Sequence, residues 1–419
     1  MNTFLDSPKS EATLTPPKPT RIETVDALRG FALFGILLVH AAQWFAAVGL
    51  PGPVYQVHAS GPANSVAQTI VGIFFDGKFY TFFSFLFGLS FALMLTRSTD
   101  SPGRFYARFA WRLVILGAIG LLHHVQWRGD ILSIYAIVGF FMLPFGWLSN
   151  KVVLVVGLLL VMNTPNRIKS LYDSYISKPV PQQQANPQPA NDYEKEAKAT
   201  YDLLKKGSFV EMAQANFYAF DDKMKFQVES GRIYITLGFF LLGLYAGRRR
   251  LFSQIDENKR FFRRLTRTTG FGVLGIIIAF ATAIAIYGNN SQPPKAIELL
   301  FGFLYDLGNT ALTIFYIAGL TLLFQRAFWQ GVVRWLTPVG KMALTSYVLQ
   351  TLIGTFLFFG YGLGLLAEIE LWQATLLTFP IFLVQVWFSR WWLARFQYGP
   401  LEWLWRSLTY LRVQPMAQS

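Results

Sequence analysis

The sequence predicts an all-α protein that crosses a lipid bilayer many times. Hydrophobic residues make up 53% of the 419-residue chain and charged residues only 14%, and the mean hydropathy is +0.36. A soluble domain of this composition would expose large apolar patches to water. Apolar runs of about 20 residues recur along the chain, as membrane-spanning helices require. Basic residues flank alternate ends of these runs, which is typical of a polytopic membrane protein.

Ten apolar runs predict the membrane-spanning helices. They lie near 28–48, 70–96, 107–124, 130–148, 151–163, 231–247, 268–288, 303–325, 340–360 and 371–393. The run 151–163 is the shortest of them. Ahead of the first run, residues 1–20 contain Pro16, Pro17 and Pro19 and predict a disordered tail.

Charge sets the expected orientation, because short loops rich in Lys and Arg stay in the cytoplasm. The connection 248–267 is densely basic, whereas the segments 49–69 and 361–370 contain no Lys or Arg. This alternation predicts that both termini are cytoplasmic. The net charge of +14 follows from the same pattern. Because the basic residues flank spans and do not form one surface, nucleic-acid binding is not expected.

The segment 164–230 is the only sizeable polar element and is predicted to lie outside the membrane. Its part 178–191 is rich in Pro and Gln and predicts an extended linker. The part 192–229 has helical composition, with apolar residues at positions such as Tyr201 and Phe217, and predicts short amphipathic helices on the outer membrane face. Two interpretations stay open, a lid over an outward-facing site and a simple connector.

The first predicted span contains the ionisable residues Arg29 and His40, and Asp26 lies just before it. Placing such side chains in lipid costs free energy, so they are candidates for functional residues. Arg29 and His40 are eleven positions apart, about three helical turns, so both lie on one face about 16 Å apart along the axis. Asp26 precedes Arg29 by three positions and shares that face. A cation therefore lies near the cytoplasmic surface and an imidazole lies past the middle of the membrane.

This spacing suits a long anionic donor from the cytosol, such as acetyl coenzyme A. Its phosphates would bind Arg29, beside Asp26, and its thioester would reach His40. His40 would then act as a general base that removes a proton from an acceptor hydroxyl or amine. The alternative for His40 is a hydrogen bond between helices, and the alternative for Arg29 is a purely topological role. No permanently bound cofactor is expected.

A second polar set lies at the outer end of the third span and the start of the fourth, and it comprises His123, His124, Arg128, Asp130 and Tyr135. His123 lies eleven positions after Arg112 and so reaches about the depth of His40. The two histidines are candidates for one shared cavity, with Asp130 as a third catalytic candidate. The spacing is not a specific metal signature, and no metal site is predicted. The chain has no Cys, which excludes disulfides, thiolate metal sites and Cys nucleophiles.

Other polar residues of the spans predict structural roles. Asp76 and Lys78 are expected to pair near the outer end of the run 70–96 or in a break within it. The four residues Asp306, Asn309, Gln350 and Gln385 are expected to form hydrogen bonds between helices.

The chain resembles the YeiB-like family of bacterial integral membrane proteins over nearly all of residues 21–415. The C-terminal half of that family, here 231–415, is a domain of unknown function, number 418. The resemblance rests on RIETVDALRGFALFGIL at 21–37, GKFY at 77–80, FLFG at 85–88, GDIL at 129–132, GKMALTSY at 340–347, YGLG at 361–364 and YGPLEWLWR at 398–406. Membership in this family implies that the protein lies in the cytoplasmic (inner) membrane of a bacterium.

More distantly, the chain is similar to transmembrane acyltransferases, including the acyltransferase-3 proteins and the heparan glucosaminide acetyltransferase. The acyltransferase-3 proteins carry an Arg followed eleven residues later by a His, both implicated in acetyl transfer, and Arg29 and His40 match that pattern. Many YeiB-like proteins have Asn at the position of His40. This departure favours a competent base in the present chain, but the family then need not share one chemistry.

The expected function is transfer of an acyl group, acetyl above all, from a cytosolic coenzyme A thioester to an acceptor on the outer side. A glycan or a lipid-linked molecule is the expected acceptor, and the lipid bilayer is the expected surroundings. The alternative from a different class is a transporter or flippase of a small metabolite or lipid, with the same polar residues along its path.

Overall fold

The computed structural model describes residues 22–46, 52–176, 190–288 and 293–418. Within these ranges the secondary structure is helical, and the one β contact is an isolated bridge between Phe396 and Ala417. The predicted all-α class is therefore confirmed. The predicted tail 1–20 and most of the predicted linker 178–191 lie outside the described residues.

The helices divide into three stretches of the chain. The first is α1 (Glu23–His40), the π-helix η1 (Ala41–Ala46), α2 (Gly52–Ala59), α3 (Pro62–Phe74), α4 (Phe79–Arg97), α5 (Pro102–Gln126), α6 (Leu132–Met142), η2 (Leu143–Gly146) and α7 (Asn150–Val161). The second is α8 (Thr164–Tyr175), α9 (Ala190–Lys206), α10 (Phe209–Tyr218) and α11 (Phe220–Glu229). The third is α12 (Arg232–Arg248), α13 (Ile255–Tyr287), α14 (Lys295–Leu323), η3 (Ala327–Trp329), α15 (Gln330–Lys341), α16 (Ala343–Phe358), α17 (Leu371–Leu393) and α18 (Pro400–Tyr410).

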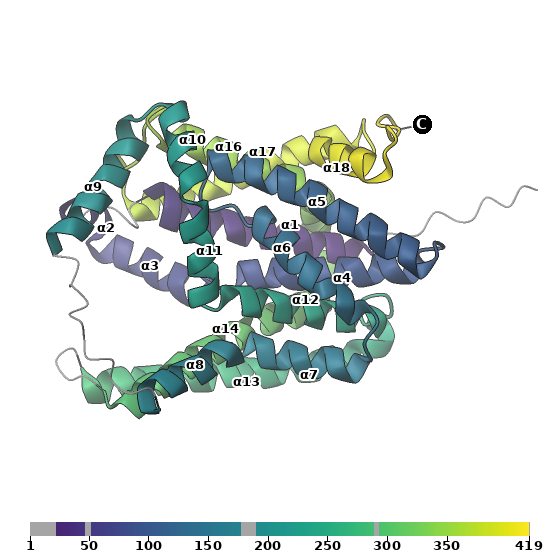
Figure 1. Cartoon of the computed structure of the whole chain (residues 1–419), viewed down its shortest axis with the longest axis horizontal. Coiled ribbons are helices and arrows are strands. Elements are labelled where there is room, and N and C mark those ends of the chain that lie inside the picture. Colours follow the sequence, from purple (N-terminus) through teal and green to yellow (C-terminus); the bar gives the residue numbers. More distant parts are fainter. Residues whose placement is uncertain (1–21, 47–51, 177–189, 289–292, 419) are drawn as a thin grey trace, which may run out of the picture.

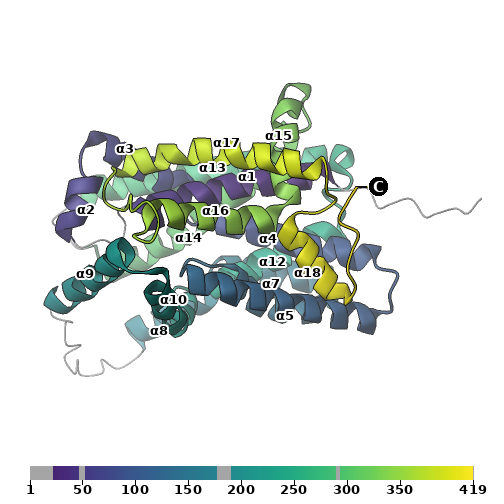
Figure 2. The ribbon, with the colours of Figure 1, turned by 90° about the horizontal axis from the view of Figure 1, so that it is seen from above.

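Most of the long helices run along one axis of the molecule. Figure 1 shows α2 and α9 at one end of this bundle and α18 at the opposite end. The view turned by 90° keeps the same separation (Figure 2). In Figure 1, α11 runs across the direction of α4, α5 and α12. The predicted amphipathic helices between 192 and 229 are thus present as α9, α10 and α11.

Five helical segments are long and apolar enough to cross a membrane. They are Pro62–Arg97, Pro102–Gln126, Ile255–Tyr287, Lys295–Leu323 and Leu371–Leu393. A sixth arises if α7 and α8, which meet at a bend of 49°, form one span, and Leu132–Gly146 and Ala343–Phe358 are shorter apolar helices. The chain is therefore a multi-pass helical membrane protein. The total of ten spans stays a prediction.

Two predicted spans have different boundaries in the structure. The predicted run 268–288 is the second part of the longer helix α13, because the preceding Arg- and Lys-rich residues are good helix formers and continue it. The predicted run 340–360 starts later, since the chain breaks at Met342 between α15 and α16.

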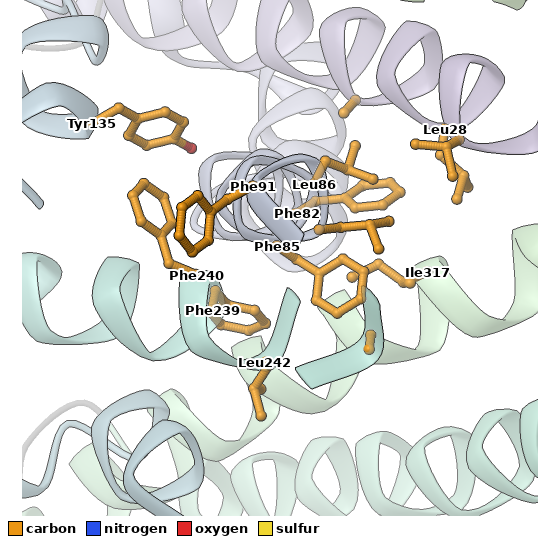
Figure 3. Packing of buried hydrophobic residues seen from close by; sticks show 14 of the residues in the cluster. Leu28, Phe82, Phe85, Leu86, Phe91, Tyr135, Phe239, Phe240, Leu242 and Ile317 are labelled. Carbon is orange, nitrogen blue, oxygen red and sulfur yellow. The ribbon is translucent and has the colours of Figure 1, made fainter. Parts of the chain in front are cut away.

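The core is centred on the packing of α4 against α12 and their neighbours. Figure 3 shows Phe82, Phe85 and Leu86 of α4 in the same buried cluster as Phe239 and Phe240 of α12. The two backbones approach closely at Gly88, where a Cβ atom would lie 1.9 Å from the carbonyl oxygen of Phe240. Small residues permit such contact between membrane helices, which then gain close van der Waals packing. This rigid pair supports α6, whose Tyr135 stacks its edge on Phe240 with ring centroids 5.2 Å apart.

Candidate functional site

The site is built around the connection from α5 to α6. α5 begins with Pro102 in its first turn, where a missing N–H costs nothing, and it ends at Gln126 just after His123 and His124. A short turn leads to Asp130, whose carboxylate accepts hydrogen bonds from the backbone N–H groups of Leu132 and Ser133, both at 3.0 Å. Asp130 therefore caps the N-terminus of α6, where the helix dipole favours a negative charge.

His123 and Asp130 form a buried pair. Nδ1 of His123 lies 2.9 Å from Oδ1 of Asp130, and the two side chains are 2% and 0% exposed. Nε2 of His123 is buried without a hydrogen-bond partner among the described residues. An imidazole that donates its Nδ1–H to a carboxylate keeps a lone pair on Nε2 that can accept a proton. The geometry therefore presents one proton acceptor, oriented by Asp130.

His40 lies beside this pair. It is the last residue of α1, and the chain continues as the π-helix η1, a feature that often marks functional sites. The His40 ring is centred 4.4 Å from the ring of Trp127 and 6.2 Å from that of Tyr347. The same two rings lie 6.1 Å and 5.1 Å from the ring of His123. The structure thus brings His40 and His123 to one place, between Trp127 and Tyr347.

Tyr347 of α16 joins the C-terminal half of the chain to this site. Its hydroxyl accepts a hydrogen bond from the backbone N–H of Ile131 at 3.2 Å and lies 3.3 Å from the carbonyl oxygen of Gly129, to which it donates. Tyr347 is only 3% exposed. It therefore fixes the loop that carries Asp130 while its ring covers His123.

Lys223 is the one charged residue of the site that sequence reasoning missed. It comes from α11, and its Nζ donates to Asp130 Oδ2 at 3.2 Å, to Ser133 Oγ at 3.0 Å and to His124 Nδ1 at 3.3 Å. The Lys223 side chain is 9% exposed, whereas its neighbour Lys225 is 70% exposed. Burial lowers the pKa of Lys223, and the Asp130 carboxylate offsets part of this effect. No sequence signal separates these two lysines, because only the path of α11 places one of them on Asp130.

Further contacts hold the segment 190–229 over the site. Asn216 of α10 donates to the carbonyl oxygen of Val125 at 3.1 Å and accepts from Nε of Arg128 at 3.0 Å. Lys205 of α9 donates to Glu368 Oε1 at 2.6 Å. These bonds tie the segment to the end of α5 and to the loop before α17.

Arg29 and Asp26 lie elsewhere on α1. Arg29 donates to Asp26 Oδ1 at 2.5 Å and to Ser90 Oγ of α4 at 2.7 Å. Eleven residues of helix place Arg29 about 16 Å from His40 along the axis, as expected. The structure therefore does not bring Arg29 into the histidine group. Among the described residues, no group of three or more His, Cys, Asp or Glu side chains is arranged to hold a metal ion.

A second buried polar group surrounds α14. Asp306 accepts from Arg167 of α8 and, at 3.4 Å, from Asn163. Asn163 has a left-handed φ of 54° at the bend between α7 and α8. About two turns further along α14, the hydroxyl of Thr313 lies 2.8 Å from that of Thr81, just after the break between α3 and α4. Asp76 and Lys78 lie in this break, but the expected pairing is not found among the described residues, because Lys78 donates instead to the carbonyl oxygen of Gly72 at 2.9 Å.

Gln350 and Gln385 form the interhelical bond expected of them. Nε2 of Gln350 donates to Oε1 of Gln385 at 2.9 Å, which joins α16 to α17. Gln350 also donates to the carbonyl oxygen of Leu33 in α1 at 3.2 Å. These bonds hold together the helices that carry Tyr347 and His40.

The fold and this site define a multi-pass helical membrane protein with a buried His–Asp pair that α11 contacts through Lys223. Residues 246–412 match the family described as "Protein of unknown function (DUF418)". The chain is 30% identical to the uncharacterized protein YxaH of Bacillus subtilis over 95% of its own length and 96% of the relative. It is 29% identical to the uncharacterized protein YeiB of Escherichia coli over 94% of its own length and 97% of the relative. It is 28% identical to an uncharacterized 39.9 kDa protein of Bacillus acidopullulyticus over 94% of its own length and 96% of the relative. The chain therefore belongs to the YeiB-like DUF418 family, which gives its relationships and no activity.

Proposed function

We propose that the protein is a membrane acyltransferase in which His123 is the general base and Asp130 orients it. The observation that carries this proposal is the buried pair with its unpartnered Nε2 atom. A base held by a carboxylate on its other nitrogen is the arrangement that activates hydroxyl or amine nucleophiles. We assign the base role to His123 and not to His40, because no carboxylate of the described residues is hydrogen-bonded to His40.

The reaction in this proposal needs one donor and one acceptor. Nε2 of His123 removes the proton from the acceptor hydroxyl or amine as that atom attacks the thioester carbonyl carbon. The carbon–sulfur bond then breaks, and the leaving thiolate takes the proton from the His123 imidazolium. His40 donates a ring N–H to the carbonyl oxygen and so stabilises the charge that develops there. The neutral thiol and the acylated acceptor leave.

The donor in this proposal is acetyl coenzyme A, which enters from the cytoplasm. Arg29 binds its phosphates by exchanging the Ser90 hydrogen bond for a phosphate oxygen, while Asp26 keeps the guanidinium in place. The acceptor is a glycan or lipid-linked molecule that reaches His123 from the outer side, beneath α11. This assignment includes ten spans with both termini inside a bacterial cytoplasmic membrane, since charge alternates along the chain.

Purified full-length protein incubated with acetyl coenzyme A and total membrane lipid or glycan extract should release free thiol. His123→Asn keeps a polar side chain of similar size but cannot accept the proton, so thiol release should fall by about 10² to 10⁴. Arg29→Ala should instead abolish the thermal stabilisation by acetyl coenzyme A. Undiminished thiol release by His123→Asn would remove the base assignment. Equal stabilisation of Arg29→Ala would remove the donor assignment alone.

The second candidate is a transporter, and the polar group around α14 favours it. Two breaks, one between α3 and α4 and one between α7 and α8, meet the same stretch of α14 through Thr81 and Asn163. Secondary transporters bind substrates and ions at broken helices near the middle of the membrane. In that case Asp306→Asn should stop uptake of a solute into proteoliposomes while thiol release from acetyl coenzyme A stays absent in every variant.

A further inference from the structure

We propose that the N-terminal part of α13 binds the phosphate of an anionic phospholipid. α13 has 33 residues and is therefore about 50 Å long. Its apolar part, 268–287, accounts for about 30 Å, which equals the thickness of the hydrocarbon core. The basic part before residue 268 consequently lies at the level of the lipid headgroups.

The basic part of α13 carries two adjoining hollows lined by cations. Arg260, Arg263, Arg264 and Arg267 line the first, together with Thr268 and Phe271, and its volume is about 470 Å³. The second, of about 220 Å³, is lined by Lys259, Arg263, Leu322, Gln325 and Arg326. Lys259 has a carboxylate partner, Asp256, at 2.5 Å. Among the described residues, none of the four arginines in the first hollow has a carboxylate within 4 Å.

The arginines continue directly into an apolar strip. Arg260, Arg264 and Arg267 are followed by Phe271 and Ile278 at spacings of three, four and seven residues, so all five lie on one face of the helix. Phe271 is 74% exposed and Ile278 is 56% exposed. Figure 1 shows α13 at the edge of the bundle.

The opposite face of α13 packs on α14. The rings of Phe280 and Phe301 lie 5.5 Å apart, and Gly270 lies against the ring of Phe315. The strip of arginines and apolar residues is therefore the side of α13 that faces away from α14 and toward the membrane.

This combination fits a phospholipid better than other occupants. Guanidinium groups bind phosphate oxygens in a bidentate manner, and an acyl chain below the phosphate would cover Phe271 and Ile278. A free phosphate compound would use only the cationic half of the strip. A second copy of the chain that packed its own strip here would bring like charges together, which opposes association.

Native mass spectrometry of the full-length protein in detergent tests this proposal, with phosphatidylglycerol and phosphatidylcholine as probes. The variant Arg260→Gln/Arg264→Gln/Arg267→Gln should bind phosphatidylglycerol roughly a hundredfold less tightly, because each cation near an anionic headgroup contributes about fivefold. The matched control is Arg104→Gln/Arg249→Gln/Arg412→Gln, which removes the same charge from other exposed positions. The control should bind phosphatidylglycerol as the wild type does. Phe271→Ser should also weaken lipid binding, since it breaks the apolar strip.

Four results would overturn the proposal. The two triple variants could lose phosphatidylglycerol equally, which would indicate general attraction between charges. The variant Arg260→Gln/Arg264→Gln/Arg267→Gln could bind phosphatidylglycerol as tightly as the wild type does. Glycerol 3-phosphate could compete as strongly as the lipid at equal concentration, which would indicate a soluble phosphate ligand. Finally, a dimer without bound lipid that dissociates in the Phe271→Ser variant would assign the strip to a second copy.

Discussion

Nζ of Lys223 lies 3.2 Å from Oδ2 of Asp130, although 93 positions separate the two residues in the chain. The contact joins α11 to the buried loop whose Asp130 is paired with His123. Both side chains are nearly inaccessible, at 9% and 0%. Removing one partner of such a pair leaves a buried charge and typically costs about 3–5 kcal/mol. The helix α11 and the His–Asp pair are therefore energetically linked.

Lys223→Met should release α11 from the site, because methionine fills similar volume but makes no hydrogen bond. The chain has no Cys, so a single cysteine at exposed Asp221 can carry a spin label without other changes. The label should become clearly more mobile in Lys223→Met and stay unchanged in the control Lys225→Met, since Lys225 is 70% exposed. An immobile label in Lys223→Met would show that other contacts suffice to dock α11.

Docking of α11 should strengthen as the pH rises. Burial lowers the pKa of Lys223 below its ordinary value of 10.5, even though Asp130 raises it in part. Released α11 would return Lys223 to water and to the ordinary value, so the released form binds the proton more tightly. Between the lowered pKa and 10.5, each rise in pH therefore favours the docked form. The mobility of the label at position 221 should fall over this range in the wild type and stay constant in Lys223→Met, and a rising mobility would contradict the assignment.

Asp130→Asn separates the orienting role of Asp130 from its capping role. Asn keeps one oxygen that can accept a backbone N–H at the start of α6, so α6 should still form, while thiol release should fall by about 10² or more because His123 loses its carboxylate. The variant also leaves the Lys223 ammonium buried without its ion pair. The double variant Asp130→Asn/Lys223→Met should consequently melt at a higher temperature than Asp130→Asn alone. Additive losses of stability would show that the two residues are not coupled.

The sequence predicted the all-α class, the closeness of His40 to His123 and the helices between 192 and 229. The periodicity and hydropathy of the sequence suffice to predict those features, because each feature depends on local sequence. The role of Lys223 and the joint covering of both histidines by Tyr347 depend on contacts between distant segments. Glu402 illustrates the same limit. Its carboxylate accepts hydrogen bonds from the backbone N–H of Leu344 at 2.6 Å and from the Thr345 hydroxyl at 2.6 Å. The segment 398–406 therefore caps the start of α16 in the segment 340–347.

The orientation of the chain can be measured with the same cysteine-free background. Lys195→Cys and Arg249→Cys each place one thiol at an exposed position. A membrane-impermeant maleimide added to intact cells should label the cysteine at 195 and leave the cysteine at 249 unlabelled until the membrane is opened. Labelling in the reverse order would place the basic segment 248–267 outside and invert the proposed direction of acyl transfer.

His40 has two candidate roles, general base and hydrogen-bond donor. Replacing it with Asn and with Ala distinguishes them. If His40 donates a hydrogen bond to the thioester carbonyl, His40→Asn should keep most of the thiol release, because the Asn amide is also a donor. His40→Ala should then lose about 10² to 10³ in rate, as is typical when one donor to a developing oxyanion is removed. Donor binding, measured by the thermal stabilisation with acetyl coenzyme A, should survive in both variants. If His40→Asn instead loses as much rate as His123→Asn, then His40 takes the proton, and His123 with Asp130 serves to hold α6 and α11 in place.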